Sequence, residues 1–191
     1  MNINTISYTL HDSPIGPILL AGTRQGIQHI TFCAGVNSGM SSELYGEKHP
    51  KHAETSWQQS AKPFSKACKQ LDEYFAGTRK TFSLTLAPEG TDFQQQVWQQ
   101  LMDIPFGDTC SYGDIAARLD NPNACRAVGA ANGANPLPIV VPCHRVIGAN
   151  GKLTGFTGGL AIKDWLLAHE RGEQSLFSFD ELRGDGGMIS E

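Results

Sequence analysis

The chain has 191 residues, enough for one large domain or two small ones with a hydrophobic core. It is 40% hydrophobic and 18% charged, as is ordinary for a soluble globular protein, and no apolar run approaches the roughly 18 residues of a membrane span. The formal net charge of -4 disfavours nucleic-acid binding by the surface as a whole, so any DNA contact must come from a local patch.

The first residues and the cysteines bear on the compartment. Residues 1–10 lack the basic segment and apolar core of a secretory signal. The five cysteines are odd in number and scattered, with no CxxC pair: Cys33, Cys68, Cys110, Cys125 and Cys143. This pattern argues against a disulfide framework, and we expect a reducing, cytoplasmic setting.

Residues 1–86 have the pattern of a small α+β domain. Apolar and polar residues alternate over residues 4–10, which predicts a strand. Residues 17–21 and 27–33 predict two further strands separated by a glycine-containing turn. Residues 35–60 are polar and aperiodic, which is typical of a long loop.

A helix and a fourth strand complete this first domain. Apolar residues recur at helical spacing from Phe64 to Phe75, and Gly77 suits the end of that helix. Alternation over residues 81–86 predicts a strand, and residues 87–90 form a linker.

Helical patterns dominate residues 91–172. Thr91 and Gln94 form a capping box before an apolar face that ends near Ile104. A last helix is expected over residues 160–171, ahead of a polar tail. We expect that tail, residues 173–191, to be loosely ordered.

Two short helices between these have the spacing of a helix-turn-helix. A capping box at Ser111 predicts the first over residues 112–119, and Asn121 followed by proline predicts the second over residues 122–132. The second is rich in alanine and glycine and carries one long cation, Arg126. Such a pair can dock on DNA, or it can be a close-packed hairpin with no ligand.

Residues 135–148, NPLPIVVPCHRVIG, are the most informative segment. Their three prolines prevent a regular central strand and predict a stiff, apolar segment that delivers Cys143 to a defined place. A cysteine nucleophile reacts as the thiolate, so we expect a neighbouring base or cation to ionise it. His144 and Arg145 can supply either, and Glu170 is a candidate to orient the histidine.

Other interpretations of Cys143 stay open from the pattern alone. The residue can be a buried small hydrophobe, or part of a Cys/His/Glu hydrolase, although no local protease signature is present. A metal site with His144 lacks a second ligand pair at a suitable spacing. The remaining histidines are interpreted as surface or packing residues: His11, His29, His49, His52 and His169.

The motif PCHRV at residues 142–146 resembles that of the O6-alkylguanine-DNA alkyltransferases, also called methylated-DNA–protein-cysteine methyltransferases. The resemblance runs from about residue 93 to 171 in separate ordered blocks, which makes it specific. These blocks are FQQQVW, IPFG, SYG, RAVG, NP, PCHRV, GG and WLLAHE. Residues 1–86 match loosely, around a DSPIG turn.

The resemblance implies an α+β fold. A small ribonuclease H-like sheet-plus-helix domain over residues 1–86 would precede a mainly helical domain over residues 91–172, with a winged-helix-like helix-turn-helix. The implied function is DNA repair: irreversible, single-turnover transfer of an alkyl group from O6-alkylguanine, and from O4-alkylthymine, to Cys143. The implied partner is double-stranded DNA, bound by a monomer with no membrane contact and no cofactor.

The resemblance also implies roles for individual residues. Cys143 would accept the alkyl group, with His144 as its base through a water and Glu170 orienting the histidine. Asn135 would brace the helix-turn-helix against the active-site segment, and Tyr112 would press on the phosphate beside the flipped nucleotide and assist protonation of the guanine.

Further implied roles concern DNA and the substrate. Arg126 would fill the gap left by the flipped nucleotide, and the small helix residues Ala127 and Gly129 would contact DNA. The implied substrate pocket consists of Pro138, Val146, Phe156 and Thr157.

The sequence departs from the family pattern at two places. Phe156 and Thr157 stand where members often carry tyrosine and serine, so bulky adducts are expected to fit differently. Where some relatives bind a structural zinc, the aligned residues are Thr5, Thr23 and Gln28, so we predict no metal. The alternative function is a non-catalytic module that binds alkylated lesions, although such proteins typically replace the reactive cysteine.

Overall fold

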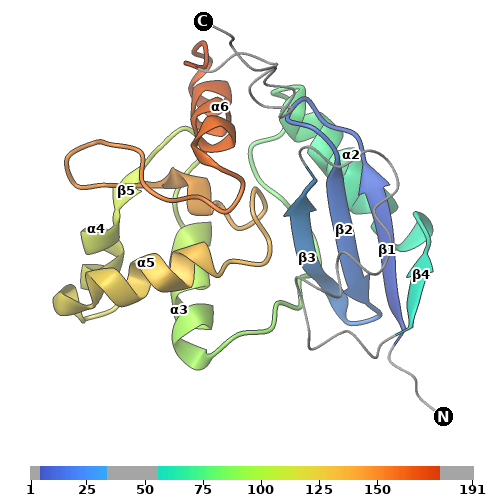
Figure 1. Ribbon diagram of the computed structural model, residues 1–191, viewed down its shortest axis with the longest axis horizontal. Helices are drawn as coiled ribbons and strands as arrows, with labels where there is room; N and C mark the ends of the chain where they lie inside the picture. The colour runs from blue at the N-terminus through green and yellow to red at the C-terminus, as the bar shows by residue number, and fades with distance from the viewer. Residues whose placement is uncertain (1–4, 34–55, 177–191) are drawn as a thin grey trace, which may run out of the picture.

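The computed structural model describes residues 5–33 and 56–176 (Figure 1). Its N-terminal part is a four-stranded sheet of order β3-β2-β1-β4, in which β4 runs parallel to β1 and the other neighbours are antiparallel. The strands are β1 (Ile6–His11), β2 (Ile18–Thr23), β3 (Gly26–Phe32) and β4 (Trp57–Gln59). The first three were predicted to within two residues at each end.

One turn of this sheet depends on a glycine. The register of β2 and β3 shifts at Ala21 and Gly22. A Cβ on Gly22 would lie 2.3 Å from the carbonyl oxygen of Gly26, too close for any side chain. Gly22 therefore lets the two strands approach at the bulge.

Helix α2 (Ser65–Phe75) lies against one face of the sheet and follows a 3-10 turn, η2 (Lys62–Phe64) (Figure 1). Its apolar side chains pack with Ile18, Leu20 and Ile30 of the sheet in one buried cluster. The helix ends before Gly77, whose φ of 73° is the left-handed conformation predicted for that position.

Two sequence predictions for this domain were wrong. Residues 81–86 form no strand: Leu86 makes one isolated bridge with Ile27, and the side-chain amide of Gln70 binds both the N–H and the carbonyl of Ser83. A side chain thus takes the groups that a strand partner would need. Strand β4 lies in the predicted 35–60 loop, whose residues 35–55 lie outside the described part.

The C-terminal part is mainly helical. Its elements are α3 (Asp92–Met102), β5 (Cys110–Ser111), α4 (Tyr112–Arg118), η3 (Pro122–Ala124), α5 (Cys125–Gly133), η4 (Cys143–Arg145), β6 (Val146–Ile147) and α6 (Leu160–Arg171). Both predicted capping boxes, at Thr91 and Ser111, are present. The predicted 122–132 helix begins instead as a 3-10 turn, and Asn121 makes no side-chain cap bond.

One buried cluster joins the two parts of the molecule. It contains sheet residues such as Ile30, helix α2 residues such as Leu71, and Val128, Val146 and Leu166 of the helical part. The chain is therefore an α+β protein whose sheet and helices share a core. No helix among the described residues has the length and apolarity to cross a membrane.

Candidate active site

The segment between α5 and η4 is held in one conformation by its own polar groups. Asn135 donates from Nδ2 to the carbonyl of Val141, 2.8 Å away, and accepts from the N–H of Leu137 at 3.0 Å. Ile139 has a φ of 72°, a strained value for a β-branched residue, and its side chain is fully buried. The prolines and this clamp make the stiff segment that the sequence predicted.

The N-terminal sheet also supports this segment. The N–H of Ile30 in β3 donates to the carbonyl of Pro136, with 2.8 Å between the two atoms. At the other side, Asn132 of α5 donates from Nδ2 to the carbonyl of Cys143 at 3.5 Å. Sheet and helix-turn-helix therefore both contact the segment that carries the cysteine.

The thiol of Cys143 is buried, with 3% of the residue exposed. Burial raises its pKa to about 11, although the Asn135 amide, the Lys163 charge and nearby main-chain N–H groups act in the opposite direction. This direction is opposite to the expectation from sequence, which was an ionised sulfur, because burial favours the neutral thiol in the free protein. Ionisation must be coupled to the reaction.

His144 is fully buried beside the cysteine, and its Nε2 lies 2.8 Å from Oε1 of Glu170. Burial lowers its pKa, which the carboxylate of Glu170 opposes only in part, so the ring is neutral at pH 7. A neutral ring that donates from Nε2 carries its lone pair on Nδ1, which has no hydrogen-bond partner among the described residues. That nitrogen is a free base in the protein interior.

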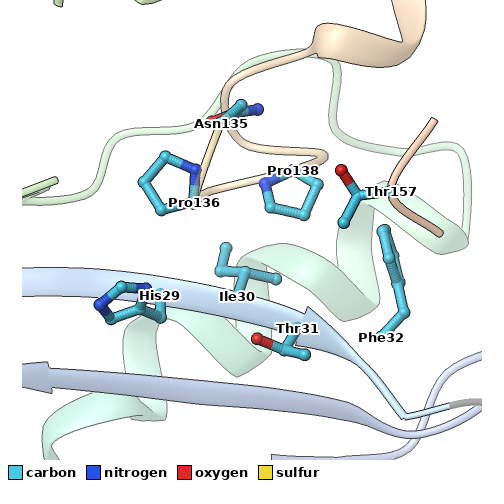
Figure 2. A pocket seen from close by; sticks show the side chains of 8 residues that line it. All are labelled: His29, Ile30, Thr31, Phe32, Asn135, Pro136, Pro138 and Thr157. Atoms are coloured by element: carbon cyan, nitrogen blue, oxygen red, sulfur yellow. The ribbon is translucent and has the colours of Figure 1, made fainter. Parts of the chain in front are cut away.

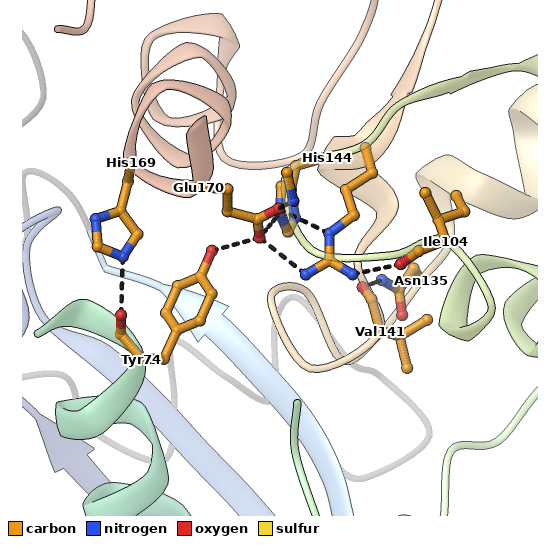
Figure 3. Close-up of polar contacts among 9 residues, drawn as sticks. Tyr74, Ile104, Asn135, Val141, His144, His169 and Glu170 are labelled. Atoms are coloured by element: carbon orange, nitrogen blue, oxygen red, sulfur yellow. Dashed lines mark hydrogen bonds and ion pairs between the residues drawn. The ribbon is translucent and has the colours of Figure 1, made fainter. Parts of the chain in front are cut away.

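Glu170 of α6 accepts five hydrogen bonds from the described residues (Figure 3). Oε1 binds the Tyr74 hydroxyl, the His144 ring and Arg145 Nη2, and Oε2 binds Arg145 Nε and the N–H of Gly107. Burial opposes ionisation, but the bonds from His144 and Arg145 outweigh it and hold the pKa of Glu170 well below its usual range.

Arg145 does not serve the sulfur as the sequence allowed. Its guanidinium binds both oxygens of Glu170 and donates from Nη1 to the carbonyl of Ile104 at 2.6 Å. The arginine therefore balances the charge of the carboxylate that orients His144.

Lys163 is a site residue that sequence reasoning missed. It projects from α6, is fully buried, and donates from Nζ to the carbonyls of Val146 at 2.6 Å and Thr154 at 2.7 Å. Burial lowers its pKa to about 8, and its charge favours the thiolate of Cys143. The only signal in the sequence was a lysine three and four residues before Leu166 and Leu167, on the apolar face of an amphipathic helix.

The helix-turn-helix presents its small-residue helix to solvent. Arg126 and Ala127 of α5 are exposed, and Gly129 is half-buried, 3.8 Å from the Tyr112 ring as measured from an added Cβ. The hydroxyl of Tyr112 accepts a hydrogen bond from Thr154 at 3.1 Å. Tyr112 therefore joins α4, α5 and the segment after β6.

A cavity of about 310 Å³ lies between β3 and the cysteine-bearing segment (Figure 2). Pro138 and Thr157 line it, together with Phe32 and Asn135, and the Phe156 ring lies 5.7 Å from that of Phe32. Val146 is fully buried in the core and does not line this cavity. The predicted pocket residues are thus only partly gathered in one place.

Fold and site together define a protein with a buried cysteine, followed in the chain by a buried histidine that binds a glutamate, beside a helix-turn-helix. The model of the 6-O-methylguanine DNA methyltransferase DNA binding domain matches residues 92–172, and that of its ribonuclease-like domain matches residues 6–88. The chain belongs to the 6-O-methylguanine DNA methyltransferase family.

Similar proteins cover nearly the whole of the described chain. The methylated-DNA–protein-cysteine methyltransferase of Methanosarcina acetivorans is 49% identical over 163 residues, 85% of this chain and 97% of that protein. The crystal structure of the Mycobacterium tuberculosis O6-methylguanine methyltransferase has a TM-score of 0.75 and 42% identity, covering 90% of this chain and 96% of that one. A structure of the M. tuberculosis protein OGT in complex with DNA has a TM-score of 0.73 and 43% identity, covering 87% and 93%.

Proposed function

We propose that this protein repairs DNA by transferring an alkyl group from O6 of alkylguanine, and from O4 of alkylthymine, to Sγ of Cys143, once per molecule. The observation that carries the proposal is the buried set of Cys143, His144 and Glu170, in a chain that belongs to the 6-O-methylguanine DNA methyltransferase family. Such a set supplies a nucleophile, a base and the group that orients the base.

The reaction balances with the protein, the lesion and water. The bond between sulfur and the alkyl carbon forms while the bond between that carbon and O6 breaks, and its electron pair passes to the guanine. The thiol proton passes through a water molecule to Nδ1 of His144, and the guanine anion takes up one proton from solvent with the assistance of Tyr112. When the imidazolium releases its proton to solvent, the one proton lost by the thiol balances the one gained by the guanine. Because a thioether has no easy hydrolytic exit, Cys143 stays alkylated and the molecule is consumed.

Because the sulfur of Cys143 is buried and protonated, the reaction depends on His144 as a base. With a pKa of about 11, Cys143 is a thiol when DNA arrives, and we propose that a water molecule carries its proton to the unprotonated Nδ1 of His144. Glu170 stabilises the imidazolium that results, since it already binds Nε2. Asn135 holds the segment through its bond to Val141, and its amide lowers the pKa of Cys143, which favours the thiolate.

The exposed face of α5 is the DNA contact in this proposal. The reacting atom of O6-alkylguanine lies within a base pair, so the nucleotide must be rotated out of the duplex, at a free-energy cost of about a few kcal/mol. Ala127 and Gly129 let the helix approach DNA closely, and Arg126 fills the gap in the stack. Tyr112 presses on the adjacent phosphate and assists protonation of the leaving guanine.

The substrate pocket is proposed to lie between the cysteine-bearing segment and residues 156–157. Pro138 and Thr157 line the cavity, and Phe156 packs beside it on Phe32. Val146 would contribute through its main chain, since its side chain is buried in the core. We propose that the protein acts as a cytoplasmic monomer on double-stranded DNA, and that its two domains, residues 1–86 and 91–172, meet at linker 87–90.

Mass spectrometry tests the transfer directly. After mixing with an equimolar duplex that contains one O6-methylguanine, Cys143 should gain one methyl group, and a second equivalent of DNA should add none. Cys143→Ala should stay unmodified, whereas Cys125→Ala, at an exposed cysteine, should react as the wild type does. Tight binding to the lesion with no added mass would favour the non-catalytic lesion-binding module instead.

A further inference from the structure

Tyr74 of α2 contributes to the reactive site from the other domain. Its hydroxyl donates to Oε1 of Glu170 at 2.8 Å, the same oxygen that lies 2.8 Å from Nε2 of His144 (Figure 3). Tyr74 and Glu170 are 96 residues apart in the sequence, and Tyr74 is fully buried. One carboxylate oxygen therefore receives a hydrogen bond from each domain.

Aromatic contacts fix the orientation of the Tyr74 ring and so direct its hydroxyl toward Glu170. Its ring packs against Phe75, Phe82 and Phe106, with centroids 5.3, 5.5 and 6.0 Å away. His169 lies 2.8 Å through Nε2 from the Tyr74 carbonyl and stacks on Trp165. The neighbouring residues His169 and Glu170 thus bind the main chain and the side chain of the same tyrosine.

The chemistry of this hydrogen bond follows from the burial of both groups. Burial and the nearby charge of Glu170 raise the pKa of Tyr74 well above its usual value, so the hydroxyl stays protonated and remains a donor. A neutral donor on Oε1 withdraws part of the negative charge that this oxygen presents to His144. The hydroxyl therefore fixes the direction of the carboxylate and limits how strongly it holds a proton on the imidazole.

We propose that Tyr74 is a positioning residue for the alkyl transfer: its hydroxyl orients Glu170 and tunes the basicity of His144, so that the N-terminal domain completes the reactive site. This inference rests on the proposed function where it concerns the rate, but its effect on His144 is independent of any substrate. If Tyr74 only supported the fold, its aromatic ring would be enough and its hydroxyl oxygen would not matter. Tyr74→Phe keeps the ring and removes the oxygen, so it separates the two roles.

The test uses the full chain and two readouts. In Tyr74→Phe, Glu170 loses one donor and attracts the His144 proton more strongly, so the pKa of His144 should rise by about half a unit to one unit, measured by NMR titration of the labelled ring. The second-order rate constant of methyl transfer should fall about tenfold at pH 7, a typical loss when a hydrogen bond that supports a reactive residue is removed. In the plot of this rate constant against pH, the acid limb should move to higher pH.

A matched variant separates packing from hydrogen bonding. Phe82→Leu disturbs the same aromatic contact with Tyr74 but leaves the hydroxyl in place, so it should lower Tm without moving the His144 titration. Replacement of Tyr74 by 3,5-difluorotyrosine makes the hydroxyl a stronger donor and should move the pKa of His144 in the opposite direction. This second variant decides the matter if Tyr74→Phe does not fold.

Unchanged titration of His144 in both Tyr74 variants would overturn the inference, whatever happens to stability. Absence of methyl transfer by the wild type would instead overturn the proposed function, and the NMR comparison would still decide the role of Tyr74. If the pKa of His144 shifts but the acid limb of the methyl-transfer rate against pH does not, the hydroxyl affects His144 without affecting the reaction. That result would also contradict the proposal.

Discussion

Lys163 Nζ lies 2.6 Å from the carbonyl oxygen of Val146, three residues after Cys143 in the chain. The same ammonium binds the carbonyl of Thr154 at 2.7 Å, so one side chain of α6 joins the segment just after Cys143 to the segment around Thr154. The cation thereby combines two effects, since it satisfies two main-chain acceptors and its charge favours the thiolate of Cys143.

Replacing this lysine should weaken both the fold and the nucleophile. Lys163→Met fills a similar volume but leaves two carbonyls without their donor, so the free energy of unfolding should fall by about 3 kcal/mol in urea denaturation. The pKa of Cys143 should rise further, which slows alkylation by iodoacetamide at pH 8. Lys152→Met, at an exposed lysine, should change neither quantity. Equal stability of the two variants would contradict the stabilising role of the two hydrogen bonds from Lys163.

Acid should remove the contribution of Glu170 to stability. Its pKa in the folded protein lies well below the value of about 4.3 in an unfolded chain, so the contribution is complete above that pH and is lost as pH falls toward the folded pKa. The wild type should therefore lose up to about 1.4 kcal/mol per pH unit from this group below pH 4.3.

The comparison that isolates this effect is the stability of Glu170→Gln against pH. That variant should be less stable than the wild type at pH 7, and the gap should narrow steadily below pH 4.3. Glu89→Gln, at an exposed glutamate, should keep a constant offset from the wild type. A gap for Glu170→Gln that stays constant down to pH 3 would mean that the folded carboxylate is not held ionised.

The exposed Arg126 should matter in a duplex and little in a single strand. If its side chain replaces the flipped nucleotide, Arg126→Ala should slow methyl transfer from duplex DNA at least tenfold, because the unstacked state loses its support. The rate on single-stranded DNA needs no such support and should fall less than threefold. Arg24→Ala, an exposed arginine in the turn between β2 and β3, controls for net charge, and equal losses on both DNA forms would refute the role.

Phe32 should limit the size of the transferred group. It closes the cavity that Pro138 and Thr157 line, and Phe32→Ala should raise the rate for O6-benzylguanine relative to O6-methylguanine. Gly158→Ala should act in the opposite direction, since its Cβ would lie 2.6 Å from Phe32 and push that ring aside. If the ratio of the rates for O6-benzylguanine and O6-methylguanine is the same in both variants and the wild type, this cavity is not the substrate pocket.

Local signals in the sequence predicted local structure well. The capping boxes at Thr91 and Ser111 depend on residues three positions apart, so pattern alone identified them. The alternation over residues 81–86 failed because it marks an extended chain without saying what pairs with it, and Gln70 occupies that place here. The 3-10 start of the second helix of the helix-turn-helix likewise depends on packing that no single residue of the sequence indicates.

Long-range relationships explain what sequence reasoning missed at the site. The motif predicted Cys143, His144 and Glu170, and the structure brings the last two to 2.8 Å. It gave no sign that Tyr74 reaches the same carboxylate from another domain, or that Lys163 is buried. Protonation of Cys143 was mispredicted because neighbours in the chain suggest charge, whereas the degree of burial decides the pKa.

Ile139 restrains the backbone of the segment that carries Cys143. Its left-handed backbone is disfavoured for isoleucine by about 1–2 kcal/mol and persists because the side chain is locked in the core. A backbone pinned in this way has no nearby alternative conformation in which Cys143 could swing outward. Under the proposed function, the DNA and not this segment must therefore deform when a lesion is bound, so the time needed to find damage should depend on how readily each base pair opens.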